Sequence, residues 1–211
     1  MSVLDKLATA LGRRDEVPNV ELAKEIAAKN DKAAVKELVA TLQSKNKDIQ
    51  FDCIKTLYEI GYVNPALIAD YAKDFIVQLD SKNNRMQWGA MTALSGIVSE
   101  NPKAVYAALG KIAAVAEKGT VITKDHYAKI LTSLGAIKQY ADDAFTLLIA
   151  LLQNAPTNQL PKYAENAVPL ITEKNKPVFI RTLTARLGDF DAGTKLKRLE
   201  KVLQKVTGLK G

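Results

Sequence analysis

The feature that most constrains the fold of this chain is a sequence pattern that returns after 37 residues. Residues 50–60, QFDCIKTLYEI, align with residues 87–97, QWGAMTALSGI. The same shift places Asn64-Pro65 on Asn101-Pro102. Proline suits the first turn of a helix and not its interior, so the shift matches helix boundaries as well as apolar positions. Repeats of 20–50 residues are typical of solenoids.

Three further units continue this pattern. A shift of 40 residues places 128–137, AKILTSLGAI, on 88–97, WGAMTALSGI. Two weaker helix pairs are expected over 142–172 and 176–206, where prolines and the sequence GDFDAG interrupt the pattern. The chain is therefore expected to contain about five helix pairs.

Apolar residues recur at helical spacing through most of the chain, which predicts an all-α fold without strands. Helices are expected over 31–42 and over 48–61, and the second of these is expected to end before Asn64-Pro65. The start, MSVLDKLATALGRR, is expected to form a short amphipathic helix within an N-terminal helical segment, 1–29. We expect one domain over 1–211, with the repeats at about 31–206.

Helix pairs of this length resemble the HEAT-repeat family, which is armadillo-like; the residues indicate no subfamily. The usual motif of its second helix is valine, arginine, alanine three residues on and leucine four after that. The corresponding residues here are Ile49, Gln50, Cys53 and Leu57, then Met86, Gln87, Ala90 and Leu94, then His126, Tyr127, Ile130 and Leu134. The apolar skeleton matches, but glutamine or tyrosine replaces the arginine, so the family's aspartate-arginine ladder is absent. The resemblance implies a right-handed α-α superhelix of about five pairs.

Composition favours a cytoplasmic protein. No segment approaches the roughly 18 uninterrupted apolar residues that span a bilayer, so no membrane partner is expected. The single cysteine, Cys53, cannot form an internal disulfide, which agrees with a reducing compartment. The net charge of +7 is uneven, because residues 1–171 hold 20 Lys and Arg against 19 Asp and Glu, whereas residues 172–211 hold 10 against 4. Attraction to an anionic partner is therefore expected at one end of the chain.

The sequence offers no constellation typical of catalysis, a metal site or a cofactor, so a non-enzymatic protein is predicted. The one histidine, His126, takes the place of Ile49 and Met86, which favours a partly buried packing residue that caps a helix start. Cys53 is expected to be a packed, inert thiol. Asp142-Asp143 is expected to open a helix, where its positive dipole end favours acidic residues.

One enzymatic precedent is the HEAT-like alkylpurine DNA glycosylases, which are basic solenoids of similar size. Resemblance to them would imply several tryptophans along a DNA groove and a carboxylate four residues after one of them. Here the only tryptophan is Trp88, and the residue four positions later is Thr92. This activity is therefore not predicted.

A stripe of aromatic residues is the candidate partner-binding site. With Cys53, Leu57 and Ile60 in the core, a turn of 100° per residue gathers aromatic residues on the other side of the same helix. In HEAT-like solenoids the second helices line the concave side, so the stripe would bind a peptide or partner protein there. The alternative is that these aromatics fill gaps between repeats. The predicted partner-binding residues are Phe51, Lys55, Tyr58, Tyr62 and Trp88.

A basic cluster near the C-terminus is the second candidate site. The helix expected over 194–206 places Leu196, Leu199, Leu203 and Val206 on one face. The other face would bind the backbone of a nucleic acid or an acidic partner, or would only keep an end repeat soluble. The predicted anion-binding residues are Arg181, Arg186, Lys197, Arg198, Lys201 and Lys205.

Overall fold

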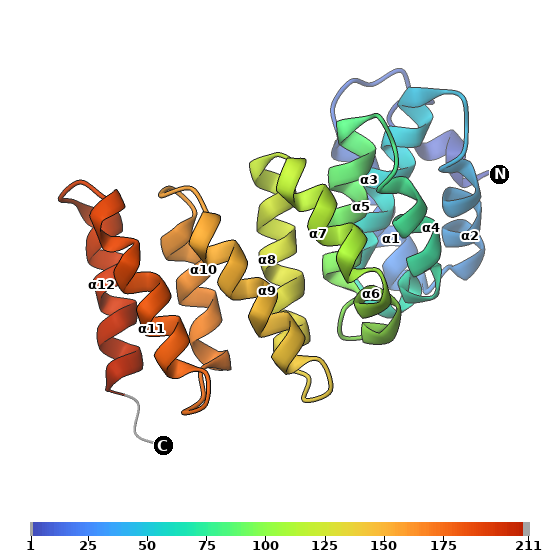
Figure 1. The fold of residues 1–211 in the computed structure, drawn as a ribbon. Helices are drawn as coiled ribbons and strands as arrows, with labels where there is room; N and C mark the ends of the chain where they lie inside the picture. The colour runs from blue at the N-terminus through green and yellow to red at the C-terminus, as the bar shows by residue number, and fades with distance from the viewer. Residues whose placement is uncertain (1, 209–211) are drawn as a thin grey trace. The chain divides into compact units, whose positions relative to one another are not determined.

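A computed structural model describes residues 2–208, and all regular structure in this range is helical (Figure 1). The all-α prediction is confirmed. None of the helices described is both long enough and apolar enough to cross a bilayer. The α-helices are α1 (Val17–Lys29), α2 (Lys32–Thr41), α3 (Lys47–Val63), α4 (Ala72–Gln78), α5 (Asn84–Gly96), α6 (Pro102–Ala107), α7 (Leu109–Lys118), α8 (Val121–Gly135), α9 (Ala141–Asn154), α10 (Leu160–Ala167), α11 (Lys176–Ala185) and α12 (Thr194–Thr207). The short 3-10 helices are η1 (Val3–Lys6), η2 (Pro65–Leu67), η3 (Ala69–Tyr71), η4 (Val168–Leu170) and η5 (Leu187–Asp189).

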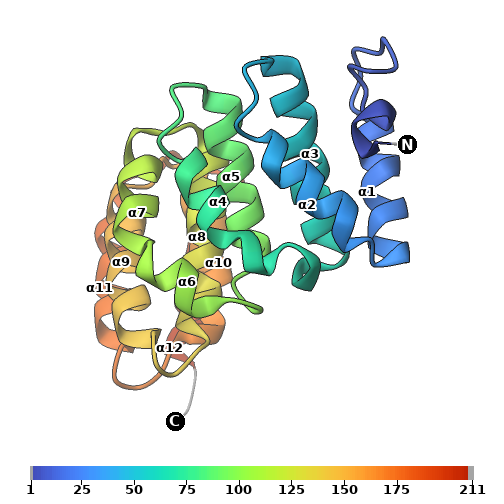
Figure 2. The ribbon, with the colours of Figure 1, turned by 90° about the vertical axis from the view of Figure 1, so that its right-hand side faces the viewer.

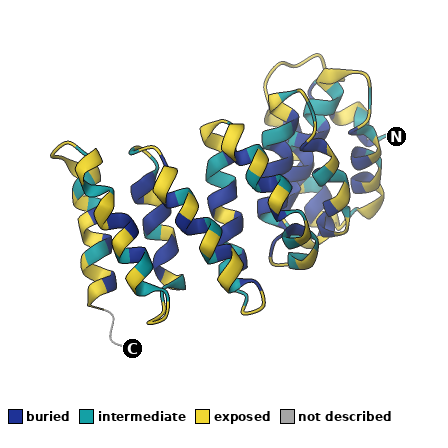
Figure 3. Ribbon diagram, in the orientation of Figure 1, coloured by how far each residue is buried: buried dark blue, intermediate teal, exposed yellow. Residues whose placement is uncertain are grey.

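The chain divides into two compact units, unit 1 (Met1–Tyr127) and unit 2 (Ala128–Gly211), with the boundary inside α8. In unit 1, α3 packs between α1 and α5, while α2 covers α3 and α4 covers α5 (Figure 2). In unit 2, α10 and α11 both pack against α12, and α9 packs against both of them. Buried residues concentrate where helices of a unit face one another (Figure 3). That the two units form one domain stays a prediction.

The 37-residue repeat is visible in how α3 and α5 begin. These helices start at Lys47 and Asn84, which are 37 residues apart. The preceding residues, Asn46 and Asn83, cap the helices, because each side-chain oxygen accepts a hydrogen bond from a backbone N–H of the first turn. The repeat therefore preserves helix-start chemistry as well as apolar spacing.

In α3 and α5, the glutamine at the position of the HEAT arginine joins the helix to the one before it. The side-chain amide of Gln50 donates to the carbonyl of Leu42, at the end of α2, over 2.8 Å. Gln87 makes the same bond to Leu79, at the end of α4, over 3.3 Å. Each bond satisfies a terminal helix carbonyl that the helix itself leaves free.

The weaker pairs predicted over 142–172 and 176–206 are present as α9 with α10 and α11 with α12. The buried face of α12 differs from the one expected. Leu199, Val202 and Val206 are buried, whereas Leu196 and Leu203 are only half-buried. Because α12 packs on both α10 and α11, its contact surface turns toward Val202.

The prediction of an amphipathic helix at the N-terminus is wrong beyond Lys6. Only Val3–Lys6 is helical there, as η1, and Met1 lies outside the described residues. The backbone N–H of Ala8 donates to Asn19 Oδ1 over 2.9 Å, and that of Thr9 donates to Asp52 Oδ2 over 2.7 Å. Side chains of α1 and α3 thus take the donors that a continuing helix would need.

The two second helices of unit 1 approach closely at a glycine. A Cβ added to Gly89 of α5 would lie 2.7 Å from Cγ1 of Ile54 in α3. Gly110 in α7, in contrast, has open space around its Cα. Packing therefore requires glycine at position 89 and not at position 110, so an alanine substitution at Gly110 serves as the control.

We predict that Gly89→Ala lowers the free energy of unfolding by about 1 kcal/mol, since overpacking costs roughly 1–3 kcal/mol and exceeds the gain in helix propensity. Gly110→Ala should leave it unchanged or raise it by up to about 0.5 kcal/mol, because only helix propensity acts there and Gly110 lies in the first turn of α7. Urea unfolding followed by circular dichroism measures both. Equal effects would contradict the close approach of α3 and α5.

In unit 2, Arg186 closes the end of α9. Its Nη1 donates to the carbonyls of Leu152 and Gln153 over 2.7 and 2.8 Å, and its Nη2 donates to Ala155 over 2.9 Å. Its Nε pairs with Asp189. The side chain is only 16% exposed, so these bonds are largely shielded from water.

We predict that Arg186→Ala lowers the free energy of unfolding by about 2 kcal/mol, because bonds to a charged donor are lost and carbonyls are left unpaired. Arg181→Ala on α11 is the control; Arg181 is exposed, so a change within about 0.5 kcal/mol is expected. The same urea titration tests both. Indistinguishable variants would refute the structural role of Arg186.

Candidate functional site

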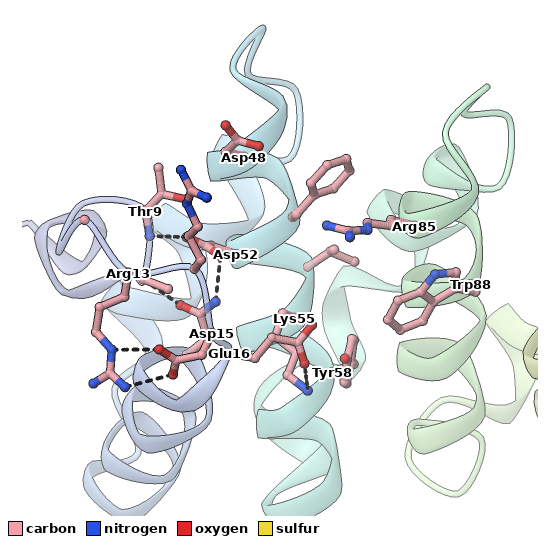
Figure 4. Close-up of a pocket in the computed structure, with 16 residues that line it drawn as sticks. Thr9, Arg13, Asp15, Glu16, Asp48, Asp52, Lys55, Tyr58, Arg85 and Trp88 are labelled. Carbon is pink, nitrogen blue, oxygen red and sulfur yellow. Dashed lines mark hydrogen bonds and ion pairs between the residues drawn. The ribbon is translucent and has the colours of Figure 1, made fainter.

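Unit 1 contains a cleft of about 520 Å³ beside α3 and α5 (Figure 4). Four segments line it: the loop between η1 and α1, which we call the N-terminal loop, the first turn of α1 at Asn19, one face of α3, and the first turns of α5. Of the predicted partner-binding residues, it brings together Phe51, Lys55, Tyr58 and Trp88. Tyr62 does not line it.

The aromatic residues play different roles in this cleft. The ring of Tyr58 lies 5.7 Å from Trp88 and 6.0 Å from Tyr62. Tyr58 is only 6% exposed, and burial raises its pKa to about 12. It therefore fills the space between α3 and α5, as in the alternative interpretation of the aromatic stripe, and not an open position on a surface. Phe51 and Trp88 are half-buried, and their partly exposed rings provide the aromatic surface of the cleft.

Lys55 holds the N-terminal loop against α3. Its ammonium group lies 2.9 Å from Glu16 and 2.8 Å from Glu59, and 4.9 Å from the centre of the Tyr58 ring. Although burial alone would lower the pKa of Lys55, its hydrogen bond with Glu59 and its other contacts raise it. The lysine is 14% exposed, and two carboxylates balance its charge.

Asp52 provides the second attachment of the N-terminal loop. Its Oδ2 accepts from the Thr9 backbone, and its Oδ1 accepts from the side-chain amide of Asn19 over 2.7 Å. Asn19 is buried, and its own oxygen accepts from Ala8. The loop is thereby fixed as one wall of the cleft.

Two arginines of the cleft, Arg14 and Arg85, are not paired with a carboxylate among the described residues, unlike its other cations. Arg13 pairs with Asp15 over 2.9 Å. Arg85 lies 5.2 Å over the ring of Phe51. Within residues 2–208, neither Arg85 nor Arg14 forms an ion pair with a carboxylate.

Sequence reasoning did not select these arginines or the loop, although a signal for Arg85 exists. The 37-residue shift aligns Asp48 with Arg85, one turn before Phe51 and Trp88 in their helices. A charged residue beside each aromatic position could therefore have been noticed. The attachment of the loop depends on contacts between distant residues, and no local pattern indicates it.

His126 does not cap a helix start, because it is the sixth residue of α8. It is half-buried, as expected. Its Nε2 lies 2.9 Å from Oγ1 of Thr92, and its Nδ1 lies 2.9 Å from Oγ of Ser95. Both hydroxyls are buried and also bond to backbone carbonyls of α5. This cluster lies outside the cleft, and its hydrogen bonds join α8 to α5.

The remaining candidates have structural environments. Cys53 is fully buried, and burial raises the pKa of its thiol to about 12. Asp142 and Asp143 lie in the first turn of α9, as predicted, and Asp142 pairs with Lys174 over 2.8 Å. The described residues include no group of three side chains suited to hold a metal ion.

The predicted anion-binding residues divide into two groups. Arg186 caps α9, and Arg198 makes two hydrogen bonds to Glu165, of 2.7 and 2.6 Å, which lower the pKa of that carboxyl group. The others are exposed, and among the described residues they form no ion pair. These exposed cations are Arg181, Lys197, Lys201 and Lys205.

No protein-family model matches this sequence, and a search of curated proteins finds no match. Solved structures do match over most of the chain. A designed armadillo repeat protein in complex with the peptide (KR)4 is 14% identical, with a TM-score of 0.67 over 88% of this chain and 85% of that one. A second designed armadillo repeat protein is 14% identical, with a TM-score of 0.65 over 96% and 99%.

An engineered protein solved by a structural genomics consortium is 20% identical, with a TM-score of 0.63 over 98% of this chain and 99% of that one. At such identities the likeness concerns the fold. Together with the helix pairs described above, it shows that this chain has a HEAT- or armadillo-like α-helical repeat fold.

Proposed function

We propose that this chain is a non-enzymatic protein-interaction scaffold whose unit 1 cleft, on the groove side of its second helices, binds a segment of a partner protein. The observation that carries the proposal is the pair of partly exposed aromatic residues, Phe51 and Trp88, that line one cleft from neighbouring helices. Tryptophan and other aromatic residues often dominate the energy of protein interfaces.

The size of the cleft favours a segment over a folded domain. A volume of about 520 Å³ accommodates a few side chains, as ligand pockets of similar volume do. The fold offers support of a general kind, because one designed armadillo neighbour was solved with a bound peptide. Lys55 and Asp52 would act here by fixing the wall formed by the N-terminal loop.

Trp88 is the only tryptophan of the chain, so its fluorescence reports directly on the cleft. We predict that octapeptides selected from a random display library will shift Trp88 emission to shorter wavelength, because they exclude water. Phe51→Ala should weaken binding about 30-fold, the effect of losing roughly 2 kcal/mol at an interface anchor. Titration of the selected peptide measures both effects.

Phe190→Ala provides the control, since Phe190 is a half-buried aromatic residue of unit 2, like Phe51 and Trp88 in unit 1. It should bind the peptide with wild-type affinity. Trp88→Ala is followed by the anisotropy of a labelled peptide, with helicity checked by circular dichroism. Peptides that bind equally well to folded Phe51→Ala and Trp88→Ala proteins would place the binding site elsewhere. Tyr62→Ala tests whether the surface extends beyond the cleft.

A second function is proposed for α12, which would bind the backbone of a nucleic acid. The supporting observation is that Lys197, Lys201 and Lys205 are exposed on one helix. Each phosphate neutralised would release counterions, so affinity would fall steeply with salt.

We predict that reversing Lys197, Lys201 and Lys205 to glutamate abolishes retention on heparin and binding of duplex DNA at low salt. The control reverses Lys36, Lys73 and Lys103, which are exposed in unit 1, and matches the change in net charge. If both triple variants lose binding equally, only net charge matters. If the α12 variant keeps wild-type binding, this helix face is a solubilising cap.

A further inference from the structure

Some of the charged side chains around the unit 1 cleft have ion-pair partners among the described residues and others have none. Of its four cations, Arg13 is paired with Asp15, and Lys55 is held between two glutamates. Arg14 and Arg85 are left without a carboxylate in the part of the chain that the structure describes. Two guanidinium groups at this cleft can therefore accept a negative group from a partner.

The carboxylates of the cleft are mostly occupied. Asp15 and Glu16 are in ion pairs, and both oxygens of Asp52 accept hydrogen bonds. Asp48 lies in the first turn of α3, where the helix dipole stabilises its charge. A basic occupant would find one carboxylate not already in use, whereas an acidic occupant would find two arginines.

Arg85 lies beside the aromatic surface and not apart from it. It is one helical turn before Trp88 on α5 (Figure 4), and its guanidinium lies 5.2 Å from the centre of the Phe51 ring. Among residues 2–208 the Arg85 guanidinium makes no hydrogen bond or ion pair, so its N–H groups stay available to bind a carboxylate in a bidentate manner. The N-termini of α3 and α5 add positive potential at the same end of the cleft.

We propose that the occupant of this cleft is an acidic peptide segment of a partner protein. An apolar side chain of the segment contacts Phe51 and Trp88, and a neighbouring Asp or Glu binds Arg85, with Arg14 receiving a second acidic residue. This inference rests on the function proposed above and specifies the chemistry of the partner.

The test is a reversal of specificity in the full-length protein. Random octapeptide libraries are selected on the wild type, on Arg14→Glu/Arg85→Glu, and on Lys36→Glu/Lys73→Glu, whose charge change is equal but lies on α2 and α4. We expect the wild type and the control to select Asp or Glu next to an apolar residue. The Arg14→Glu/Arg85→Glu protein should select Lys or Arg in those places.

The best acidic peptide is then titrated against all three proteins. Its Kd should rise at least tenfold for Arg14→Glu/Arg85→Glu, stay within about twofold for the control, and rise with salt as exposed ion pairs are screened. Replacing its acidic residues by Gln should abolish the difference between the proteins.

Failure of this inference differs from failure of the proposed function. Peptides that depend on Phe51 and Trp88 but are neutral or basic on the wild type would overturn the acidic partner and leave the binding cleft in place. Absence of any peptide that depends on Phe51 and Trp88 would overturn both. A single-stranded octanucleotide that binds more tightly than the peptide, with the same dependence on Arg85, would overturn the choice of a peptide.

Discussion

The approach of α3 to α5 at Gly89 is the constraint on which the rest of unit 1 depends. A side chain at this position would meet the branched side chain of Ile54, so only glycine lets the helices pack at this distance. The residue before it, Trp88, contacts the ring of Tyr58, which fills the space between the two helices. A wider spacing would separate the aromatic groups and replace one cleft by two shallow surfaces.

The sequence predicted the helix pairs well because their signals are local. Asn46 and Asn83 cap helices through their own side chains, and apolar spacing fixes which face is buried. Contacts from outside a segment are what the pattern missed. The N-terminal residues read as an amphipathic helix, but Asn19 and Asp52 take their backbone donors. On α12, Val202 is buried because two helices share that face.

The candidate site could be predicted only in part for the same reason. A helical wheel correctly separates Phe51 from the core, and the repeat correctly places Trp88 beside it. A helical wheel cannot show that a neighbouring helix covers Tyr58. It also cannot show that Lys55 forms an ion pair with Glu16 of the N-terminal loop. Which charges of the cleft stay unpaired, and hence the charge proposed for a partner, can be judged only when these distant groups are placed.

The repeat position that holds Gly89 in α5 is occupied by Asp52 in α3, 37 residues earlier. Each residue suits its own neighbour: Asp52 accepts hydrogen bonds from the N-terminal loop and α1, while Gly89 leaves room for Ile54. A tandem copy of the first repeat would place an aspartate against an isoleucine, and a tandem copy of the second would leave the loop without its acceptor. A longer array made by duplication of one repeat would thus need a substitution at this position. The residue at this position therefore distinguishes the first repeat from the second.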